Sequence, residues 1–353
     1  MHFRTANVAQ LDQFDEIIDV RTPAEFAEDH IPGAISCPVL SDEERVTVGT
    51  MYKQVSPFEA RKVGAVLVSM NIARHLQTHF CDRPKSWRPL IYCWRGGQRS
   101  AAMNIIFSQV GWSTHQLQGG YKAYRQHTLQ TLAELPQQLT LNIICGPTGS
   151  GKSRLLAALA RQGQQVLDLE ALASHRGSVL GQLPQSPQPS QKWFDSCLLH
   201  SLRQFDLTRP VYVEAESNKI GAITLPVALC QQMHASTCIM VEVSMAERTR
   251  FLLEDYAFYL REPQRLITQL EVLKPLYGKE RLAEWTALVH SGQFETLVGD
   301  LLRRHYDPAY LRSMNNHYAA LAQAPRVALA SLTDAALDAI VDEFQSDRFG
   351  VPS

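Results

Sequence analysis

The sequence predicts an α/β protein made of two domains, each built around a mostly parallel sheet. Three observations support this prediction. The chain has 353 residues, which is long for one hydrophobic core and sufficient for two. In its first third, short apolar runs alternate with stretches of helical apolar spacing. The same alternation starts again after a polar stretch at residues 135–140, so the predicted domains are residues 1–135 and 136–353.

The segments of the first domain are short and follow one another closely. Apolar, strand-like runs lie at residues 16–20, 31–36, 89–93 and 113–118. Helix-like runs lie between them, at residues 22–30, 57–80, 99–111 and 121–135. Pro23 stands where the first of these helices begins, a position at which its missing N–H costs nothing.

The second domain shows the same pattern and then becomes helical. Strands are expected at residues 140–145, 164–170, 210–217 and 237–244, with a helix at 154–163. From residue 246 to about 304 the apolar spacing is almost wholly helical, and a strand-like piece at 324–331 and a helix at 334–344 close the chain.

A single thiol lies in a loop of glycine and positive charge, "IYCWRGGQRS", residues 91–100. Cys93 ends a predicted strand and faces the start of a helix, where backbone N–H groups favour an anion. Arg95 and Arg99 add positive charge, so the loop favours the reactive thiolate. The remaining loop residues would supply backbone N–H groups: Trp94, Gly96, Gly97 and Gln98. A buried structural cysteine is the better interpretation for the other six, but not for Cys93.

A second glycine-rich loop, "GPTGSGKS", matches the phosphate-binding pattern G-x-x-x-x-G-K-[ST]. It follows a predicted strand and precedes a predicted helix, as the motif requires. Lys152 would reach a terminal phosphate and Ser153 would hold Mg²⁺. The other residues assigned to the phosphate or diphosphate site are Gly146, Gly149, Ser150 and Gly151. The second domain is therefore predicted to be P-loop NTPase-like, with a helical C-terminal extension.

Acidic residues follow two of the strands expected in this domain. Glu214 and Glu216 lie at one strand end, where either would bind a Mg²⁺ ion through a bridging water. Asp168 and Glu170 lie at another, as candidates for the base or for a substrate contact. Solvated polar loop residues are the alternative interpretation.

Basic residues elsewhere in the domain are weaker candidates. Arg248 and Arg250 would be lid arginines closing over phosphates, or else part of a charged helix face. His175 and Arg176, in "SHRGSVLG", would contact a single-stranded nucleic acid, or else belong to a flexible loop.

Composition excludes several classes. Formal net charge is −1, so any nucleic-acid surface must come from local clustering of charge. Seven scattered cysteines without a C-x-x-C pair disfavour a zinc site or a disulfide framework. No apolar run approaches the roughly 18 residues of a membrane span. A reduced, cytoplasmic protein with no membrane partner is expected.

Three segments resemble the rhodanese-type sulfurtransferases: "IIDVRTPAEFAEDHIPGAIS", "IYCWRGGQRS" and "LQGGYKAYR". The resemblance implies that Cys93 carries sulfur as a persulfide and that Asp19, Arg21, His30 and Gly33 belong to the structural framework of the fold. Arg99 follows Cys93 after five residues, a C-x5-R spacing that resembles dual-specificity phosphatases with a larger, phosphate-wrapping loop. A phosphate-bearing donor would suit this loop, and a phosphatase is the alternative.

The whole chain resembles the tRNA 2-selenouridine synthase family. "DLEALASHRGSVLG", "VEAESNKIG", "LKPLYGKE" and "HYDPAY" carry this resemblance, together with the order of the two loops. It implies a transferase that replaces sulfur by selenium at C2 of the wobble 2-thiouridine, at the anticodon of tRNAs for lysine, glutamate and glutamine. Selenophosphate is the implied selenium donor and geranyl diphosphate the implied prenyl donor. Selenophosphate synthetase is a possible protein partner.

The two donors are assigned to the two loops by hypothesis. Cys93 would take selenium as an S-selanylcysteine while Arg95 and Arg99 hold the phosphate. The loop at residues 146–153 would bind geranyl diphosphate, with Mg²⁺ on Ser153 and Glu214. Two alternatives stay open: an ATP-dependent tRNA sulfurtransferase or RNA kinase, and a non-enzymatic regulator in which Cys93 senses oxidants.

Overall fold

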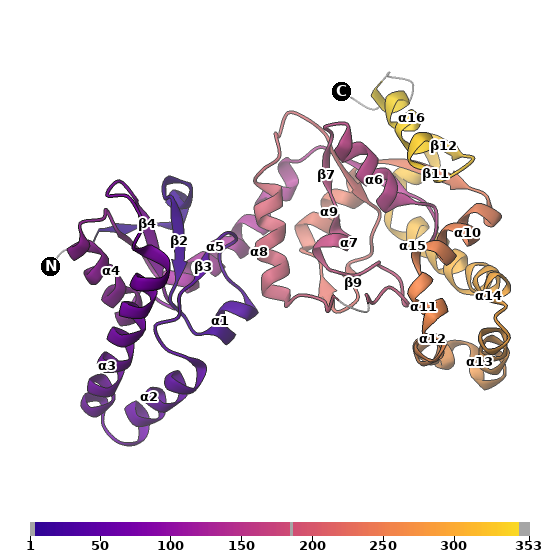
Figure 1. The fold of residues 1–353 in the computed structure, drawn as a ribbon. Helices are drawn as coiled ribbons and strands as arrows, with labels where there is room; N and C mark the ends of the chain where they lie inside the picture. The colour runs from indigo at the N-terminus through magenta and orange to yellow at the C-terminus, as the bar shows by residue number, and fades with distance from the viewer. Residues whose placement is uncertain (1–3, 184–185, 346–353) are drawn as a thin grey trace. The chain divides into compact units, whose positions relative to one another are not determined.

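The computed structural model describes residues 4–183 and 186–345 (Figure 1). Contacts divide the chain into two units, each described by itself. The first unit contains Met1–Thr131 together with Ser190–His200, and the second contains Leu132–Pro189 together with Ser201–Ser353. No helix in the described part of the chain combines the length and apolarity that a membrane crossing requires.

The first unit contains a five-stranded sheet in the order β1-β5-β4-β2-β3. All neighbouring strands are parallel, and Ile18 of β2 pairs with Ile91 of β4. The strands are β1 (Thr5–Ala6), β2 (Glu16–Asp19), β3 (Ile35–Ser36), β4 (Pro89–Tyr92) and β5 (His115–Leu117).

Helices cover both faces of this sheet because its residues alternate between two cores. Ile91 packs with Met103 and Phe107 on one face, whereas Leu90 and Tyr92 pack into a different cluster on the other. The helices are α1 (Pro23–Glu28), α2 (Asp42–Gln54), α3 (Pro57–His75), α4 (Gln98–Val110) and α5 (Gly120–Glu134).

The second unit also has a five-stranded parallel sheet, in the order β12-β11-β6-β8-β7. Its strands are β6 (Leu141–Cys145), β7 (Gln165–Leu167), β8 (Val211–Glu214), β11 (Thr237–Val243) and β12 (Arg326–Leu329). β9 (Lys219–Ile220) and β10 (Ile223–Thr224) form a separate antiparallel pair. Two parallel sheets are the architecture that the alternating pattern predicts.

The helical section is an insertion between two strands of this sheet. The helices of the second unit are α6 (Lys152–Arg161), α7 (Leu169–Leu172), α9 (Val227–Ala235), α10 (Met245–Asp255), α11 (Ala257–Arg261), α12 (Pro263–Leu270), α13 (Lys274–His290), α14 (Phe294–Leu301), α15 (Asp307–His317) and α16 (Asp334–Gln345). After α10–α15 the chain returns to the sheet as β12, which pairs with β11. Leu337 and Val341 of α16 then pack on α6, beside the central strand. One further helix, α8 (Gln191–Leu202), belongs almost wholly to the first unit.

Candidate functional site

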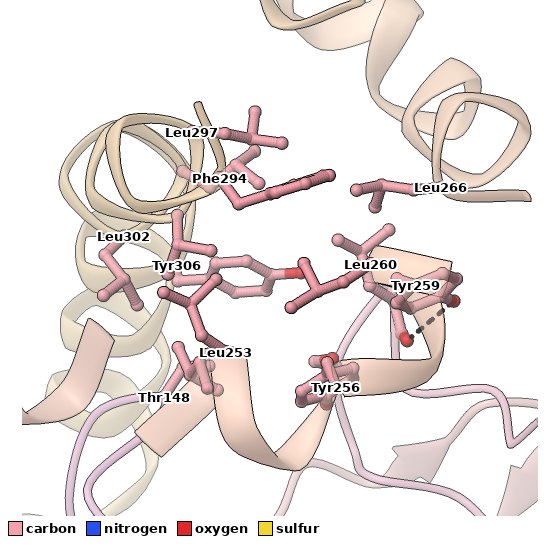
Figure 2. Close-up of a pocket in the computed structure, with 15 residues that line it drawn as sticks. Thr148, Leu253, Tyr256, Tyr259, Leu260, Leu266, Phe294, Leu297, Leu302 and Tyr306 are labelled. Atoms are coloured by element: carbon pink, nitrogen blue, oxygen red, sulfur yellow. Dashed lines mark hydrogen bonds between the residues drawn. The ribbon is translucent and has the colours of Figure 1, made fainter. Parts of the chain in front are cut away.

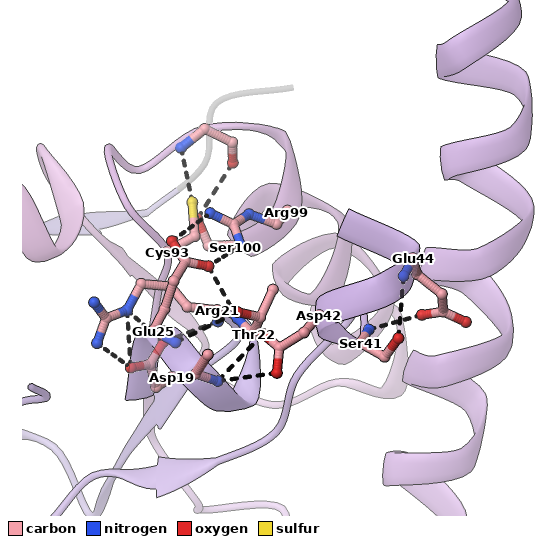
Figure 3. Close-up of polar contacts among 12 residues, drawn as sticks. Asp19, Arg21, Thr22, Glu25, Ser41, Asp42, Glu44, Cys93, Arg99 and Ser100 are labelled. Atoms are coloured by element: carbon pink, nitrogen blue, oxygen red, sulfur yellow. Dashed lines mark hydrogen bonds and ion pairs between the residues drawn. The ribbon is translucent and has the colours of Figure 1, made fainter. Parts of the chain in front are cut away.

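The thiol of Cys93 lies directly after β4, where two donors face it. The Gly97 N–H donates to Sγ at 3.2 Å, and the Ser100 hydroxyl donates at 3.1 Å (Figure 3). Its other side joins the apolar cluster of the first unit, and the residue is 3% exposed. Two hydrogen-bond donors directed at one sulfur stabilise negative charge on it. The thiol side chain is therefore largely shielded from solvent.

The segment "LQGGYKAYR" holds the thiol loop in place. Tyr121 N–H donates to the Cys93 carbonyl at 2.8 Å, and Lys122 N–H donates to the Trp94 carbonyl at 3.0 Å. Gly120, with φ +59°, lies so close that a Cβ there would stand 2.2 Å from the Cys93 carbonyl oxygen. The sequence predicts a strand, a turn and a helix here and carries a family resemblance, but it does not predict this contact with the thiol loop. Its doubled glycine was the signal that backbone approaches backbone here.

The two arginines of the thiol loop differ in their exposure and in their partners. Arg95 is exposed, as are Trp94 and Gln98. Arg99 forms an ion pair with Glu25, Nη1 to Oε2 at 2.7 Å. Burial alone would raise the pKa of Glu25, but hydrogen bonds from Arg99 and from the Thr22 N–H outweigh it and lower that pKa. No motif in the sequence indicates this partner, which lies 74 residues upstream of Arg99.

Asp19 and Arg21 have the structural role that the resemblance implied. Arg21 is 1% exposed and bonds to Asp19, Nη2 to Oδ2 at 2.7 Å, and to the Asp29 carbonyl at 2.6 Å. Its guanidinium also lies over the Tyr121 ring, 4.0 Å from the centroid. The pair therefore ties β2 to the segment that supports the thiol loop.

The phosphate loop follows β6 and leads into α6. Gly149 and Gly151 have φ of +82° and +75°, which a residue with a side chain rarely adopts. Lys152 donates from Nζ to the Gly146 carbonyl at 2.9 Å, and the Gly146 N–H donates to the Tyr310 hydroxyl at 2.6 Å. Residues 148–154 line a cavity of about 470 Å³, called the polar cavity because its lining includes charged side chains such as Lys152, Glu170 and Glu216. Of the predicted phosphate-loop residues, Gly149, Ser150, Gly151, Lys152 and Ser153 line this cavity, whereas Gly146 does not.

Carboxylates gather beside this loop. Ser153 donates to Glu170 at 3.0 Å, and the Glu170 N–H donates to Oε1 of Glu214 at 2.9 Å. Glu216 shares a hydrogen bond with the Glu170 side chain. Burial and then the neighbouring carboxylates raise the pKa of Glu214, whose side chain is fully buried and whose Oε2 has no partner. Asp168, at the N-terminus of α7, caps that short helix through the Ala171 N–H.

Several carboxyl groups of this cluster have raised pKa values. Burial and then the charge of Glu170 raise the pKa of Glu216 to about 8. Burial also raises the pKa of Glu170, against the lowering effect of the Lys152 charge. Such shifts favour proton sharing among these groups at neutral pH.

The residues predicted to hold Mg²⁺ differ in their access to the cavity. Ser153 and Glu216 line it, whereas Glu214 is fully buried and does not line it. Glu170, predicted as a base or a substrate contact, also lines the cavity. Hydroxyl and carboxylate oxygens are suitable Mg²⁺ ligands. In the described residues, no group of three or more acidic, histidine or cysteine side chains is arranged to hold a metal ion. The structure thus places Glu170, not Glu214, next to Ser153.

The remaining basic candidates are engaged with acidic groups or buried. Arg248 is buried, donates to the Thr148 carbonyl at 2.9 Å and pairs with Asp307. Arg250 lies on the exposed face of α10 and pairs with Glu247 and Glu254. Two further candidates lie in the loop after α7: Arg176 pairs with Asp255, and His175 is 8% exposed. Their lid and RNA roles stay predictions.

An apolar cavity adjoins the polar one. It is lined by the helical section, with side chains from α10, α11, α12 and α14 and from η5 (Leu302–Tyr306) (Figure 2). It is the smaller of the two, about 70 Å³, and no charged residue lines it. Thr148 of the phosphate loop lines both cavities. Sequence reasoning missed this cavity, because helical spacing shows that a helix buries a face but not what that face meets.

Comparisons with known proteins agree with this architecture. Residues 5–127 match the model of the rhodanese-like domain, and residues 139–272 match the tRNA 2-selenouridine synthase AAA domain. A protein named tRNA 2-selenouridine synthase from Nitrosomonas europaea is 39% identical over 244 residues, covering 68% of this chain and 63% of that protein. A second, from Nitrosomonas eutropha, is 37% identical and 62% covered. The chain thus spans less than two thirds of these two relatives.

A third relative matches over more of its length. A tRNA 2-selenouridine synthase from Bdellovibrio bacteriovorus is 34% identical over 350 residues, covering 86% of this chain and 89% of that protein. The chain belongs to the tRNA 2-selenouridine synthase family. Membership in this family confirms the predicted fold class, a rhodanese-like domain followed by a P-loop-type α/β domain.

Proposed function

We propose that this protein is an enzyme with the activity for which its family is named, forming 2-selenouridine in tRNA. In the proposed reaction, the sulfur of the wobble 2-thiouridine attacks C1 of geranyl diphosphate, and the C–O bond breaks to release diphosphate. Selenium then attacks C2 of the nucleoside, and the geranyl thiolate leaves. The proposed tRNA substrates are those for lysine, glutamate and glutamine.

The observation that carries this proposal is the sharing of Thr148 by a polar and an apolar cavity. A donor with an anionic head and a hydrocarbon tail fits such a pair of cavities. Lys152 and the N–H groups of the phosphate loop would hold the diphosphate, stabilising the charge that develops as it leaves. The tail would enter the apolar cavity and exclude water from C1.

Mg²⁺ is a further proposed component of the phosphate site. Ser153 and Glu170 offer it oxygen ligands next to the diphosphate position. When bound, it would supply positive charge to the leaving diphosphate. The raised pKa of Glu216 lets this side chain hold or accept a proton near neutral pH.

Cys93 is the proposed carrier of selenium from selenophosphate, as an S-selanylcysteine. In the proposed step Cys93 starts as a mixed disulfide with a small thiol: the selenium of selenophosphate attacks Sγ, the S–S bond breaks and the small thiolate leaves, and water then cleaves the Se–P bond to release phosphate. After the selenium attacks C2 of the nucleoside, the small thiol attacks Sγ, which releases the selenouridine and restores the mixed disulfide. The Gly97 N–H and the Ser100 hydroxyl would stabilise the terminal charge of the S-selanyl group, as they face the thiol. Arg99, released from Glu25, would hold the phosphate of the donor.

The test uses thiolated anticodon stem-loops, geranyl diphosphate and selenophosphate, with products identified by mass. Cys93→Ala should abolish selenation and leave geranylation intact. Lys152→Ala should reduce geranylation by about 100-fold or more, the scale of losing one transition-state charge contact. Arg161→Ala, an exposed arginine at the end of α6, is the control and should change neither step. Equal loss of both steps in both variants would contradict the division of labour.

A nucleotide-dependent activity is the second candidate, since the phosphate loop alone would equally suit ATP. An ATP-dependent tRNA sulfurtransferase or RNA kinase would turn over ATP faster when thiolated tRNA is added. Geranyl transfer in the absence of any nucleotide would exclude this candidate.

A further inference from the structure

We infer that Phe294 limits the length of the prenyl chain that the protein accepts. The inference rests on the proposed function, because it assigns the apolar cavity to the tail of a prenyl diphosphate. It goes further by naming the wall that the end of the tail would meet.

The mouth of the apolar cavity lies at the phosphate loop. Five residues line both this cavity and the polar one: Thr148, Ser178, Leu252, Tyr256 and Tyr306. A diphosphate held by Lys152 would therefore direct its attached carbon chain past these residues. The carbon atoms farthest from the diphosphate would lie where the lining belongs to the apolar cavity alone.

Phe294 closes the far end. Figure 2 shows its ring extending toward Leu266, on the opposite side of the cavity from Thr148. It is the first residue of α14, and Leu297 follows it one turn later on the same face of the helix. Leu266 is 6% exposed and Leu297 is 1% exposed, so both are fixed in the helical core, whereas Phe294 is only half-buried. The Phe294 ring is therefore the removable part of this wall.

The lining is apolar apart from a few hydroxyl groups, and most of these already have partners. Ser178 is hydrogen-bonded to both Tyr256 and Tyr306. Tyr259 already donates its hydroxyl to the Leu180 carbonyl at 3.3 Å, the dashed contact in Figure 2. A hydrocarbon pocket discriminates by fit, since each further carbon is either buried or obstructed. Chain length is thus the property that Phe294 would control.

The experiment gives the full-length protein and a thiolated stem-loop an equimolar mixture of geranyl and farnesyl diphosphate. The ratio of the two prenylated products is read by mass. Phe294→Ala should raise the farnesyl-to-geranyl ratio at least about tenfold, the lower end for changing one methylene group in an apolar pocket. Phe294→Leu should shift the ratio in the same direction by less. Leu282→Ala removes packing from the same helical core without touching the cavity, and should leave the ratio unchanged.

The outcomes separate the inference from the function on which it rests. An unchanged ratio in an active Phe294→Ala protein would overturn the inference and leave the proposed function standing. If Phe294→Ala does not fold, an unchanged ratio in Phe294→Leu would overturn it equally. Failure of the wild-type protein to transfer either prenyl group would instead overturn the proposed function. An equal shift in Leu282→Ala would show that loosening of the core, not Phe294, sets chain length.

Discussion

The two glycine-rich loops have the same topological position and different surroundings. Each follows the central strand of a five-stranded parallel sheet, β4 in the first unit and β6 in the second, and each leads into a helix. The donors of the thiol loop face its own sulfur, and Arg99 pairs with Glu25. The phosphate loop borders a cavity of about 470 Å³ instead.

This difference shows that one local design can have two kinds of surroundings, and we propose that each suits a different chemistry. N–H groups at a helix start favour an anion in both units. In the first unit the group that such an N–H faces is the sulfur of Cys93, an atom of the protein itself, which the loop keeps covered. In the second it is proposed to be the head of a ligand, so the loop must stay open. The predictions below test this contrast, beginning with the largest expected effect.

The largest effect is expected from a methyl group placed against the covered loop. Gly120→Ala puts a Cβ 2.2 Å from the Cys93 carbonyl oxygen and 2.5 Å from the Gly96 nitrogen, at a φ that disfavours side chains. We expect it to lower the free energy of unfolding of the first unit by about 3 kcal/mol and to abolish selenation. Denaturant unfolding and the tRNA assay measure the two effects.

Gly97→Ala is the matched control for this substitution. No atom stands within 4 Å of its added Cβ, and the N–H that faces Cys93 is kept. Equal losses in Gly97→Ala and Gly120→Ala would mean that close backbone approach does not hold the loop.

The stability of the second unit is expected to depend on pH because of Glu216. Glu216 keeps its proton up to about pH 8 in the folded protein, whereas an ordinary glutamate releases it near 4.5. Between these values the folded state binds more protons than the unfolded state, so stability falls as pH rises. The melting temperature of the second unit should therefore fall as the pH is raised from 5 to 8. Glu216→Gln should flatten this slope, and parallel curves for the two proteins would contradict the raised pKa.

A smaller effect should follow from removing the internal partner of Arg99. Glu25→Gln keeps an acceptor for the Thr22 N–H at the start of α1 but removes the charge that pairs with Arg99. If Arg99 binds the donor phosphate, the KM for selenophosphate should fall about fivefold, equal to roughly 1 kcal/mol for a partly exposed pair. Steady-state kinetics with varied selenophosphate measure it.

Glu28→Gln provides the comparison on the same helix. Glu28 is exposed and pairs with Lys192, so the KM of Glu28→Gln for selenophosphate should equal that of the wild-type protein. A higher KM in Glu25→Gln would show that Glu25 positions Arg99 for the donor instead of competing with it.

The sequence predicted the order of strand, glycine loop and helix at each site, but not which distant residues contact the loops. Strand, glycine loop and helix follow one another within a few residues, so the positions of Cys93 and Lys152 were evident from spacing alone. Glu25 lies 74 residues from Arg99, and only the folding of the chain brings them together. Ser153 likewise forms a hydrogen bond with Glu170, whereas Glu214 was the expected neighbour; Glu214 is fully buried and does not line the cavity. The order of residues in the chain does not show which carboxylate is buried and which faces the cavity.

The most direct test of the central claim is to find the selenium on the protein. Wild-type protein whose Cys93 has first been converted to a mixed disulfide with a small thiol is treated with selenophosphate, digested and mapped by mass, beside Cys93→Ser given the same treatment. A gain of one selenium atom on the wild-type peptide that contains residue 93, reversed by a thiol reductant and absent from Cys93→Ser, is the predicted result. Selenium on another cysteine, or full selenation of tRNA by Cys93→Ser, would contradict the account.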